Sequence, residues 1–126
     1  MKMNLKNKKV FVTGAGGFIG SHLCSKLVNE GAFVTAMLHY NSRSDWSNLE
    51  FLDSNTKKSL KVIKGNVEDS SFMDYHTKGQ DIIFHLAALI GIPYSYDAPL
   101  SYVKTNIQGT VNVLESTRKN KIPDRK

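Results

Sequence analysis

Short apolar runs alternate along the chain with segments in which apolar residues recur at a helical period. The runs have the length and the β-branched or aromatic composition of buried strands. They cover residues 10–13, 32–38, 60–65 and 81–86. Between the first two runs, Ile19, Leu23 and Leu27 form one apolar stripe. This stripe predicts a helix that ends at Gly31, because glycine is the usual residue just past a helix end.

Two further helices follow from the same pattern. Apolar residues at a helical period predict a long helix over residues 99–119. Pro99 suits the first turn of that helix, and the basic residues at its far end suit the helix dipole. A shorter helix is expected over residues 71–77, with either Asp69 or Ser70 as its cap.

The order of the elements predicts the fold class. Residues 41–58 are polar throughout, so we expect a long connection there, with a short helix around residues 46–52. Strands that alternate with helices in this order indicate a parallel sheet with helices on both faces. The predicted fold is α/β, a three-layer, Rossmann-like, doubly wound parallel sheet that stops after the first four strands. A chain of 126 residues suits one domain, residues 1–126.

Charge and composition narrow the class of protein. The formal net charge is +6, but residues 118–126 hold five basic residues against one acid, and another basic cluster precedes the first strand. The body of the chain is near balance, so no nucleic-acid partner is expected. No apolar run approaches the roughly 20 residues that span a bilayer, so we expect no membrane partner and a cytoplasmic location. The single Cys24 lies among apolar helix residues and is expected to be a core side chain.

A glycine cluster lies where the first strand turns into the first helix. Its spacing is Gly14-x-x-Gly17-x-x-Gly20. In such a loop the first glycine allows the tight turn, the second lets the backbone approach a pyrophosphate, and the third lets the helix pack close to the strand. The free N–H groups and the positive dipole end at the helix start then bind phosphate. Because no Gly-Lys-Ser/Thr follows, the loop is not a P-loop.

Residues 13–22 resemble the N-terminal signature of the extended short-chain dehydrogenase/reductase family, the NAD-dependent epimerases and dehydratases. Three further segments resemble motifs of that family in the same order: residues 65–69, 81–88 and 106–115. In the first of these Asn66 replaces an acid that faces the adenine edge. Residues 39–50 and 87–96 look like a narrower group, the sugar-nucleotide 4,6-dehydratases that act on nucleotide-activated N-acetylglucosamine in nonulosonic (legionaminic-type) acid pathways.

The resemblance implies a site for a nicotinamide dinucleotide. In this resemblance the small residues Ala87 and Ala88 would permit close approach of the cofactor, and Asn106 would lie near the cofactor. His85 is interpreted as structural rather than catalytic. The candidate cofactor-binding residues are Gly14, Gly17, Phe18, Ile19, Gly20, His39, Asn66, Val67, Leu86, Ala87, Ala88 and Asn106.

The choice between NAD and NADP stays open at the sequence level. NAD-binding members place an acid about 20 residues beyond the glycine loop, at the end of the second strand. Residues 38–40 occupy that place here and contain no acid. Asn41 could bond the ribose, whereas Arg43 could meet a 2′-phosphate. We favour NAD, because the similar subgroup carries the same non-acidic stretch.

The catalytic pair of the family is missing from the sequence. Family members use a tyrosine with a lysine four residues on, which lowers the pKa of the tyrosine for proton transfer. No tyrosine of this chain has such a lysine. Residues 122–126 are also polar where a fifth strand is expected to begin.

We therefore expect an incomplete dinucleotide-binding domain, the N-terminal part of a sugar-nucleotide 4,6-dehydratase or epimerase, which would meet a nucleotide sugar only with a missing C-terminal part. A non-catalytic cofactor sensor and an inert truncation product are the alternatives. The helix over residues 100–118 is expected to pair with a second copy of the chain, as the corresponding helix does in dimers of the family.

Overall fold

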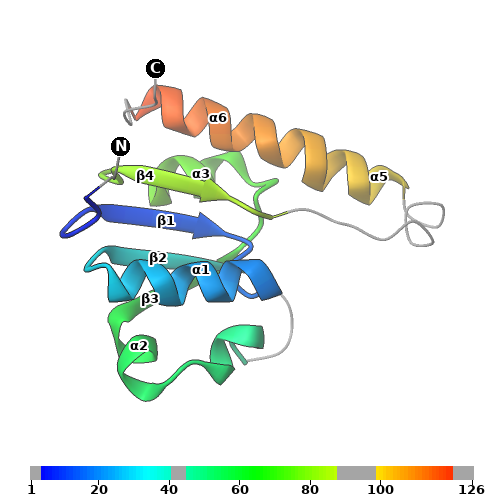
Figure 1. Ribbon diagram of the computed structural model, residues 1–126. Coiled ribbons are helices and arrows are strands. Elements are labelled where there is room, and N and C mark those ends of the chain that lie inside the picture. The colour runs from blue at the N-terminus through cyan, green and yellow to red at the C-terminus, as the bar shows by residue number, and fades with distance from the viewer. Residues whose placement is uncertain (1–3, 41–44, 88–98, 121–126) are drawn as a thin grey trace.

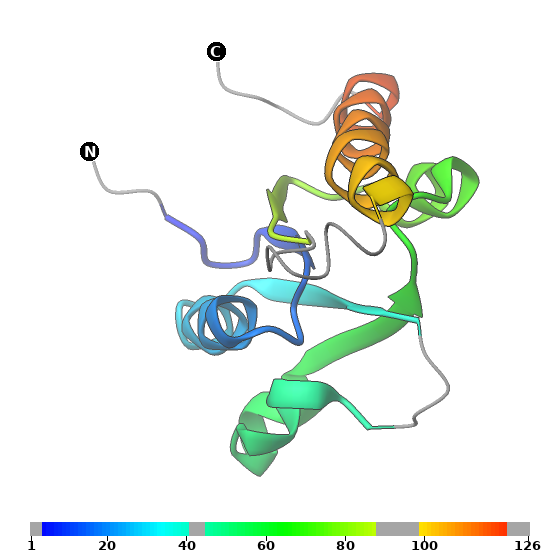
Figure 2. The same ribbon diagram turned by 90° about the vertical axis from the view of Figure 1, so that its right-hand side faces the viewer.

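Four parallel strands form one sheet, and helices pack against both of its faces (Figures 1 and 2). The computed structural model describes residues 4–40, 45–87 and 99–120. The strand order is β3-β2-β1-β4, so the chain starts in the sheet at β1, moves to one edge and then crosses to the other. The strands are β1 (Lys9–Thr13), β2 (Phe33–His39), β3 (Leu60–Gly65) and β4 (Ile82–His85).

The register of the central strands places alternate side chains in two separate cores. Val10 of β1 pairs with Val34 of β2 and with Ile82 of β4. Val10, Val12 and Val34 face one core, whereas Phe11 and Met37 face the other. Because all of these residues are buried, both faces of the central strands are covered. The predicted α/β, Rossmann-like parallel sheet is therefore confirmed.

The first face is covered by α1 (Phe18–Asn29), the 3-10 turn η1 (Ser47–Phe51) and α2 (Ser54–Ser59). Cys24 and Leu27 of α1 and Leu49 of η1 fill this core. Burial raises the pKa of the Cys24 thiol to about 12, so the thiol stays protonated. Cys24 is thus a core side chain, as the sequence predicted.

The second face is covered by α3 (Ser70–His76) and by a long helical segment. That segment consists of α5 (Pro99–Tyr102), the π-helical η2 (Val103–Gln108) and α6 (Gly109–Lys119). Figure 2 shows α1 on one side of the sheet and α3 with α6 on the other. Within the described residues, none of the helices combines the length and the apolar character needed to cross a bilayer.

The helix ends lie close to where the sequence places them. Asp69 caps α3 by accepting a hydrogen bond from the N–H of Phe72 at 3.1 Å, which decides between the two candidate caps. Gly31 follows the end of α1 with a φ of +88°, a conformation that favours glycine. The long helix starts at Pro99, as predicted.

Two features differ from the expectation. The polar connection contains the helix α2, which is capped by Asp53 through the N–H of Thr56 at 2.8 Å. The predicted long helix contains the π-helical η2 in its middle. The helix α2 buries only Thr56 and has no apolar stripe, and the helical stripe that crosses η2 does not distinguish a π-helical from an α-helical course, so periodicity could not reveal either feature.

Candidate functional site

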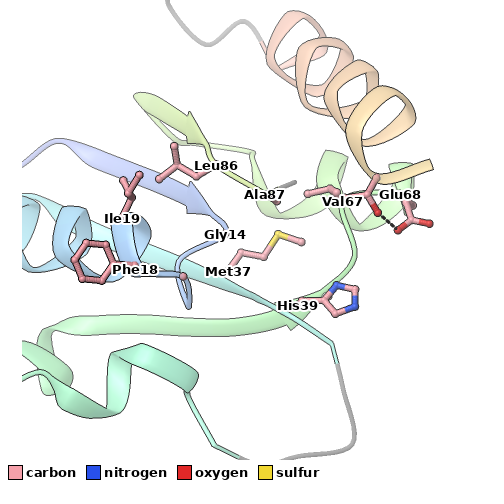
Figure 3. A pocket seen from close by; sticks show the side chains of 12 residues that line it. Gly14, Phe18, Ile19, Met37, His39, Val67, Glu68, Leu86 and Ala87 are labelled. Atoms are coloured by element: carbon pink, nitrogen blue, oxygen red, sulfur yellow. Dashed lines mark hydrogen bonds between the residues drawn. The ribbon is translucent and has the colours of Figure 1, made fainter. Parts of the chain in front are cut away.

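A pocket of about 580 Å³ opens at the carboxyl ends of the strands. In an open parallel sheet, ligands bind at the carboxyl ends of the strands. Figure 3 shows side chains from the β1–α1 loop, the end of β2, the β3–α3 turn and the segment after β4 converging on it. The lining consists of Gly14, Gly17, Phe18, Ile19, Met37, His39, Gly65, Val67, Glu68, Leu86, Ala87 and Thr105.

The glycine loop brings backbone rather than side chains to the pocket. Gly14 has a φ of +69°, and a Cβ there would lie 2.7 Å from the carbonyl carbon of Leu86. A Cβ on Gly20 would collide with the carbonyl oxygen of Gly14. By contrast, a Cβ on Gly17 would meet only the Gly14 oxygen, at 3.5 Å. Gly14 and Gly20 are thus required by packing, whereas Gly17 keeps the space in front of α1 open.

The start of α1 is suited to an anion. Its N-cap is Gly17, which has no side chain to bond the first N–H groups, and its first turn carries no acidic residue. The positive end of the helix dipole and these N–H groups face the pocket through Gly17 and Phe18. A phosphate group is the ligand that such a helix start binds best.

Apolar side chains form much of the remaining wall. Phe18 and Ile19 are 73% and 70% exposed, and both line the pocket. Met37, Val67 and Leu86 also line the pocket (Figure 3). An apolar wall beside an anion-binding helix start suits a ligand with flat rings joined through phosphates.

A hydrogen-bond network centred on Thr13 and His85 holds the segment after β4. The buried Thr13 hydroxyl accepts the N–H groups of Leu86 at 3.0 Å and Ala87 at 3.1 Å, and it lies 2.8 Å from Nδ1 of His85. Nε2 of His85 lies 3.1 Å from the Thr110 hydroxyl, which itself donates to the carbonyl of Asn106 at 2.8 Å.

These hydrogen-bond partners show which ring nitrogen of His85 carries the proton. Since the Thr110 hydroxyl donates to Asn106, it accepts from Nε2–H of His85, and Nδ1 then accepts from the Thr13 hydroxyl. Burial lowers the pKa of His85, which favours this neutral ring. Both nitrogens are engaged in joining β1, β4 and the long helix, so the contacts favour the structural role expected from the sequence.

A second connection joins the helix to the β3–α3 turn. The Thr105 hydroxyl of η2 donates to a carboxylate oxygen of Glu68 at 3.1 Å, and both residues line the pocket (Figure 3). Among the described lining residues, Glu68 is the one carboxylate, and none is a lysine or an arginine.

The structure brings most of the predicted site residues together. Eight of them line the pocket: Gly14, Gly17, Phe18, Ile19, His39, Val67, Leu86 and Ala87. Three others do not. Gly20 packs against the backbone of Gly14. The side chain of Asn66 is exposed, and its carbonyl oxygen accepts the N–H of Asp69 in a turn. The carbonyl oxygen of Asn106 accepts a hydrogen bond from the Thr110 hydroxyl. Ala88 lies outside the described residues.

Sequence reasoning missed four lining residues, Met37, Gly65, Glu68 and Thr105. Met37 lies near the carboxyl end of a predicted strand and Gly65 ends another, and residues at the carboxyl ends of parallel strands are candidates for a ligand site. Thr105 gave no such signal, because its position depends on the π-helical course of η2.

Comparison with known proteins places this geometry in a family. The family model for GDP-mannose 4,6 dehydratase matches residues 11–126. The UDP-N-acetyl-alpha-D-glucosaminuronate decarboxylase of Bacillus cytotoxicus is 33% identical over 115 residues, which are 90% of this chain and 34% of that protein.

Solved structures agree with this placement. The UDP-N-acetylglucosamine 4-epimerase of Methanobrevibacter ruminantium M1, in complex with UDP-N-acetylmuramic acid, is similar with a TM-score of 0.78 and 33% identity, over 93% of this chain and 36% of that one. The enzyme WbmH of Bordetella bronchiseptica, in complex with NAD+, is similar with a TM-score of 0.73 and 28% identity, over 92% of this chain and 37% of that one.

The chain therefore spans about a third of the length of these relatives. The match of the family model covers nearly the whole chain and includes the glycine loop, the β3–α3 turn and the long helix. The resemblance seen in the sequence is confirmed at the level of the family. The chain belongs to the GDP-mannose 4,6 dehydratase family of NAD-dependent epimerases and dehydratases.

Proposed function

We propose that this chain is the dinucleotide-binding, N-terminal part of an NAD-dependent sugar-nucleotide 4,6-dehydratase or epimerase, and that it does not catalyse the reaction alone. The observation that carries the proposal is the pocket, where an uncapped helix start meets a glycine loop and an apolar wall at the carboxyl ends of four parallel strands. This combination fits a dinucleotide, whose phosphates and rings need those two environments.

The residues present suggest how the cofactor would be held. The backbone at Gly14 and Gly17, with the start of α1, would bind the pyrophosphate. His39 and Val67 would border the adenosine half, since the ends of the second and third strands serve that half in this fold. Leu86 and Ala87 would border the other half. When bound, the nicotinamide supplies hydride transfer, and the protein supplies binding and orientation.

NAD suits the described lining better than NADP. A 2′-phosphate adds about two negative charges and is bound in proteins by lysine or arginine. The described lining holds the Glu68 carboxylate and neither of these cations. Arg43, the candidate for a 2′-phosphate contact, lies outside the described residues. The complex of WbmH with NAD+ supports the same choice by likeness.

The reaction of the whole protein is inferred from its relatives. Two of them carry UDP-sugar names, a decarboxylase and a 4-epimerase. We extend this to a nucleotide-activated N-acetylglucosamine as the substrate, as the segments over residues 39–50 and 87–96 indicate. The missing tyrosine–lysine pair supports the absence of turnover by this chain alone.

The proposal is tested by calorimetric titration of the purified chain with NAD and NADP, followed by incubation with NAD and UDP-N-acetylglucosamine. We expect saturable NAD binding with a dissociation constant in the micromolar to millimolar range, about tenfold or more weaker binding of NADP, and no conversion of UDP-N-acetylglucosamine on incubation. A folded chain that binds neither dinucleotide would overturn the proposal, and turnover by the chain alone would overturn its second half.

A further inference from the structure

The β3–α3 turn, which forms one wall of the pocket, is held by a buried amide that no expectation from the sequence assigned. Asn112 of α6 is only 5% exposed, and its Nδ2 donates to the carbonyl oxygen of Val67 at 2.8 Å. Its Oδ1 accepts from Nε2 of Gln108 at 3.1 Å. With both ends of the amide engaged, Asn112 can present only its donor to Val67.

This hydrogen bond fixes backbone that faces the pocket. The carbonyl of Val67 belongs to the peptide unit that leads into Glu68, and both residues line the pocket. Holding that carbonyl fixes the plane of the peptide and therefore the direction of the Glu68 N–H and the origin of its side chain. Val67 is itself 4% exposed, so its carbonyl would have no water to replace a lost partner.

Two other contacts show that the helix and the turn form one unit. Gly109 lies against Val67 so closely that a Cβ there would approach Cγ2 of Val67 to 2.5 Å. One helical turn earlier, Thr105 donates to the Glu68 carboxylate. Of these three contacts, only the hydrogen bond from Asn112 is buried and holds a backbone carbonyl of the turn, so it has the greatest effect on the course of the turn.

We propose that Asn112 is a positioning residue, which sets the Val67–Glu68 wall of the pocket and thereby the affinity for the adenosine half of the dinucleotide. The inference rests on the proposed function, because it names the wall that this half would meet. Asn112 itself does not line the pocket, so it acts through Val67.

The test compares Asn112→Asp with Asn120→Asp in the full chain. Each variant removes an amide donor from the same helical segment, because Nδ2 of Asn120 donates to the Thr77 hydroxyl at 2.8 Å and to the carbonyl of Asp74 at 3.1 Å, away from the pocket. We expect Asn112→Asp to weaken AMP binding about tenfold and to speed amide exchange over residues 66–69. Asn120→Asp is expected to change AMP affinity by less than about twofold.

A third variant keeps the test decisive if Asn112→Asp does not fold. Gln108 is exposed, so Gln108→Ala leaves the core intact but releases Oδ1 of Asn112. We expect faster exchange over residues 66–69 and AMP binding weakened about threefold. Nicotinamide mononucleotide serves as the probe of the other half, and its affinity should not change in any of the variants.

The possible outcomes separate this inference from the proposed function. Unchanged exchange at the turn in Asn112→Asp and Gln108→Ala would overturn the positioning role, whatever the chain binds. Faster exchange with unchanged AMP affinity would overturn its link to the ligand. If the wild-type chain bound neither NAD nor AMP, the proposed function would fall with that link, while the exchange data would still decide whether Asn112 holds the turn.

Discussion

At the scale of single residues, the polar groups that matter most in this protein are those that connect segments distant in the sequence. Thr13 and His85 are 72 residues apart, yet the Thr13 hydroxyl accepts two N–H groups from the segment after β4 and bonds the imidazole at 2.8 Å. Because every hydrogen-bonding group of Thr13 and His85 is used, changing the protonation of His85 has a predictable effect.

Protonation of His85 should destabilise the fold. Burial lowers the pKa of His85 below its ordinary value of 6.5, so at acidic pH the unfolded chain binds more protons than the folded one. The contribution of the neutral ring is complete above about pH 6.5 and is lost as the pH falls through the folded pKa. We therefore expect urea unfolding of the wild-type chain to show a lower free energy at about pH 5 than at about pH 7.5.

The variant His85→Asn checks the origin of this pH dependence. It should lower the free energy of unfolding at neutral pH by about 1–3 kcal/mol, because the buried Thr13 hydroxyl loses its acceptor Nδ1 and the Thr110 hydroxyl loses the Nε2–H donor. It should also flatten the slope between the two pH values. His76 keeps its own share of the slope in the variant, since partial burial and then Lys61 lower its pKa too. An unchanged slope in His85→Asn would contradict the assignment.

At the scale of elements, the sequence predicts the helices and strands that have an apolar periodicity or a capping residue, and it misses the helices that lack an apolar stripe or depart from α-helical geometry. The four strands and α1 were predictable because apolar runs and an apolar stripe end at turn residues. The helix α2 buries only Thr56, so it has no stripe to detect; its one signal is Asp53 in the N-cap position. The π-helical η2 could not be predicted, because neither the apolar pattern nor a capping residue distinguishes its course from that of an α-helix.

In the candidate site, the predictable residues are likewise those that belong to local motifs. Gly14, Gly17 and the residues after β4 belong to local motifs, so the sequence places them at the pocket. Glu68 and Thr105 meet only because the long helix crosses the β3–α3 turn, and that crossing depends on tertiary packing. Asn66 lies within a motif, but its side chain points to solvent.

The packing of the long helix against this turn can be tested at Gly109. An alanine within a helix normally stabilises by about 1 kcal/mol over glycine. Here we expect Gly109→Ala to lower the free energy of unfolding by about 1–3 kcal/mol, because the new Cβ meets Cγ2 of Val67. In the background Val67→Ala, which removes that methyl group and leaves the Cβ of residue 67 at 3.2 Å, the same change should cost less. Additive effects of the two substitutions in thermal or urea unfolding would contradict this close approach.

At the scale of the whole molecule, a stripe of exposed apolar residues runs along the long helical segment. Leu100, Val103, Ile107, Val111 and Leu114 are each between 46% and 72% exposed. Figure 1 shows this segment extending along one side of the molecule beyond β4. Exposed apolar stripes of this kind mark surfaces that bind another protein.

We expect the stripe to pair with a second copy of the chain, as proposed from the sequence. Ile107→Lys should shift the sedimentation equilibrium toward the monomer by about tenfold or more, because it would bury an unpaired ammonium at the interface. The matched control is Phe51→Lys in η1, since Phe51 is 86% exposed and lies on the other side of the sheet. A wild-type chain that remains monomeric at high concentration would contradict the pairing.

The central claim for the molecule is that the space in front of Gly17 holds the phosphates of a dinucleotide. The most direct test is the NAD affinity of Gly17→Val measured by titration calorimetry beside the wild-type chain. The fold should persist, with a loss of at most about 1 kcal/mol, because a Cβ at this position meets only the Gly14 oxygen at an ordinary distance. We predict saturable NAD binding by the wild-type chain and none by the folded variant. Equal affinities for the two chains would contradict the account.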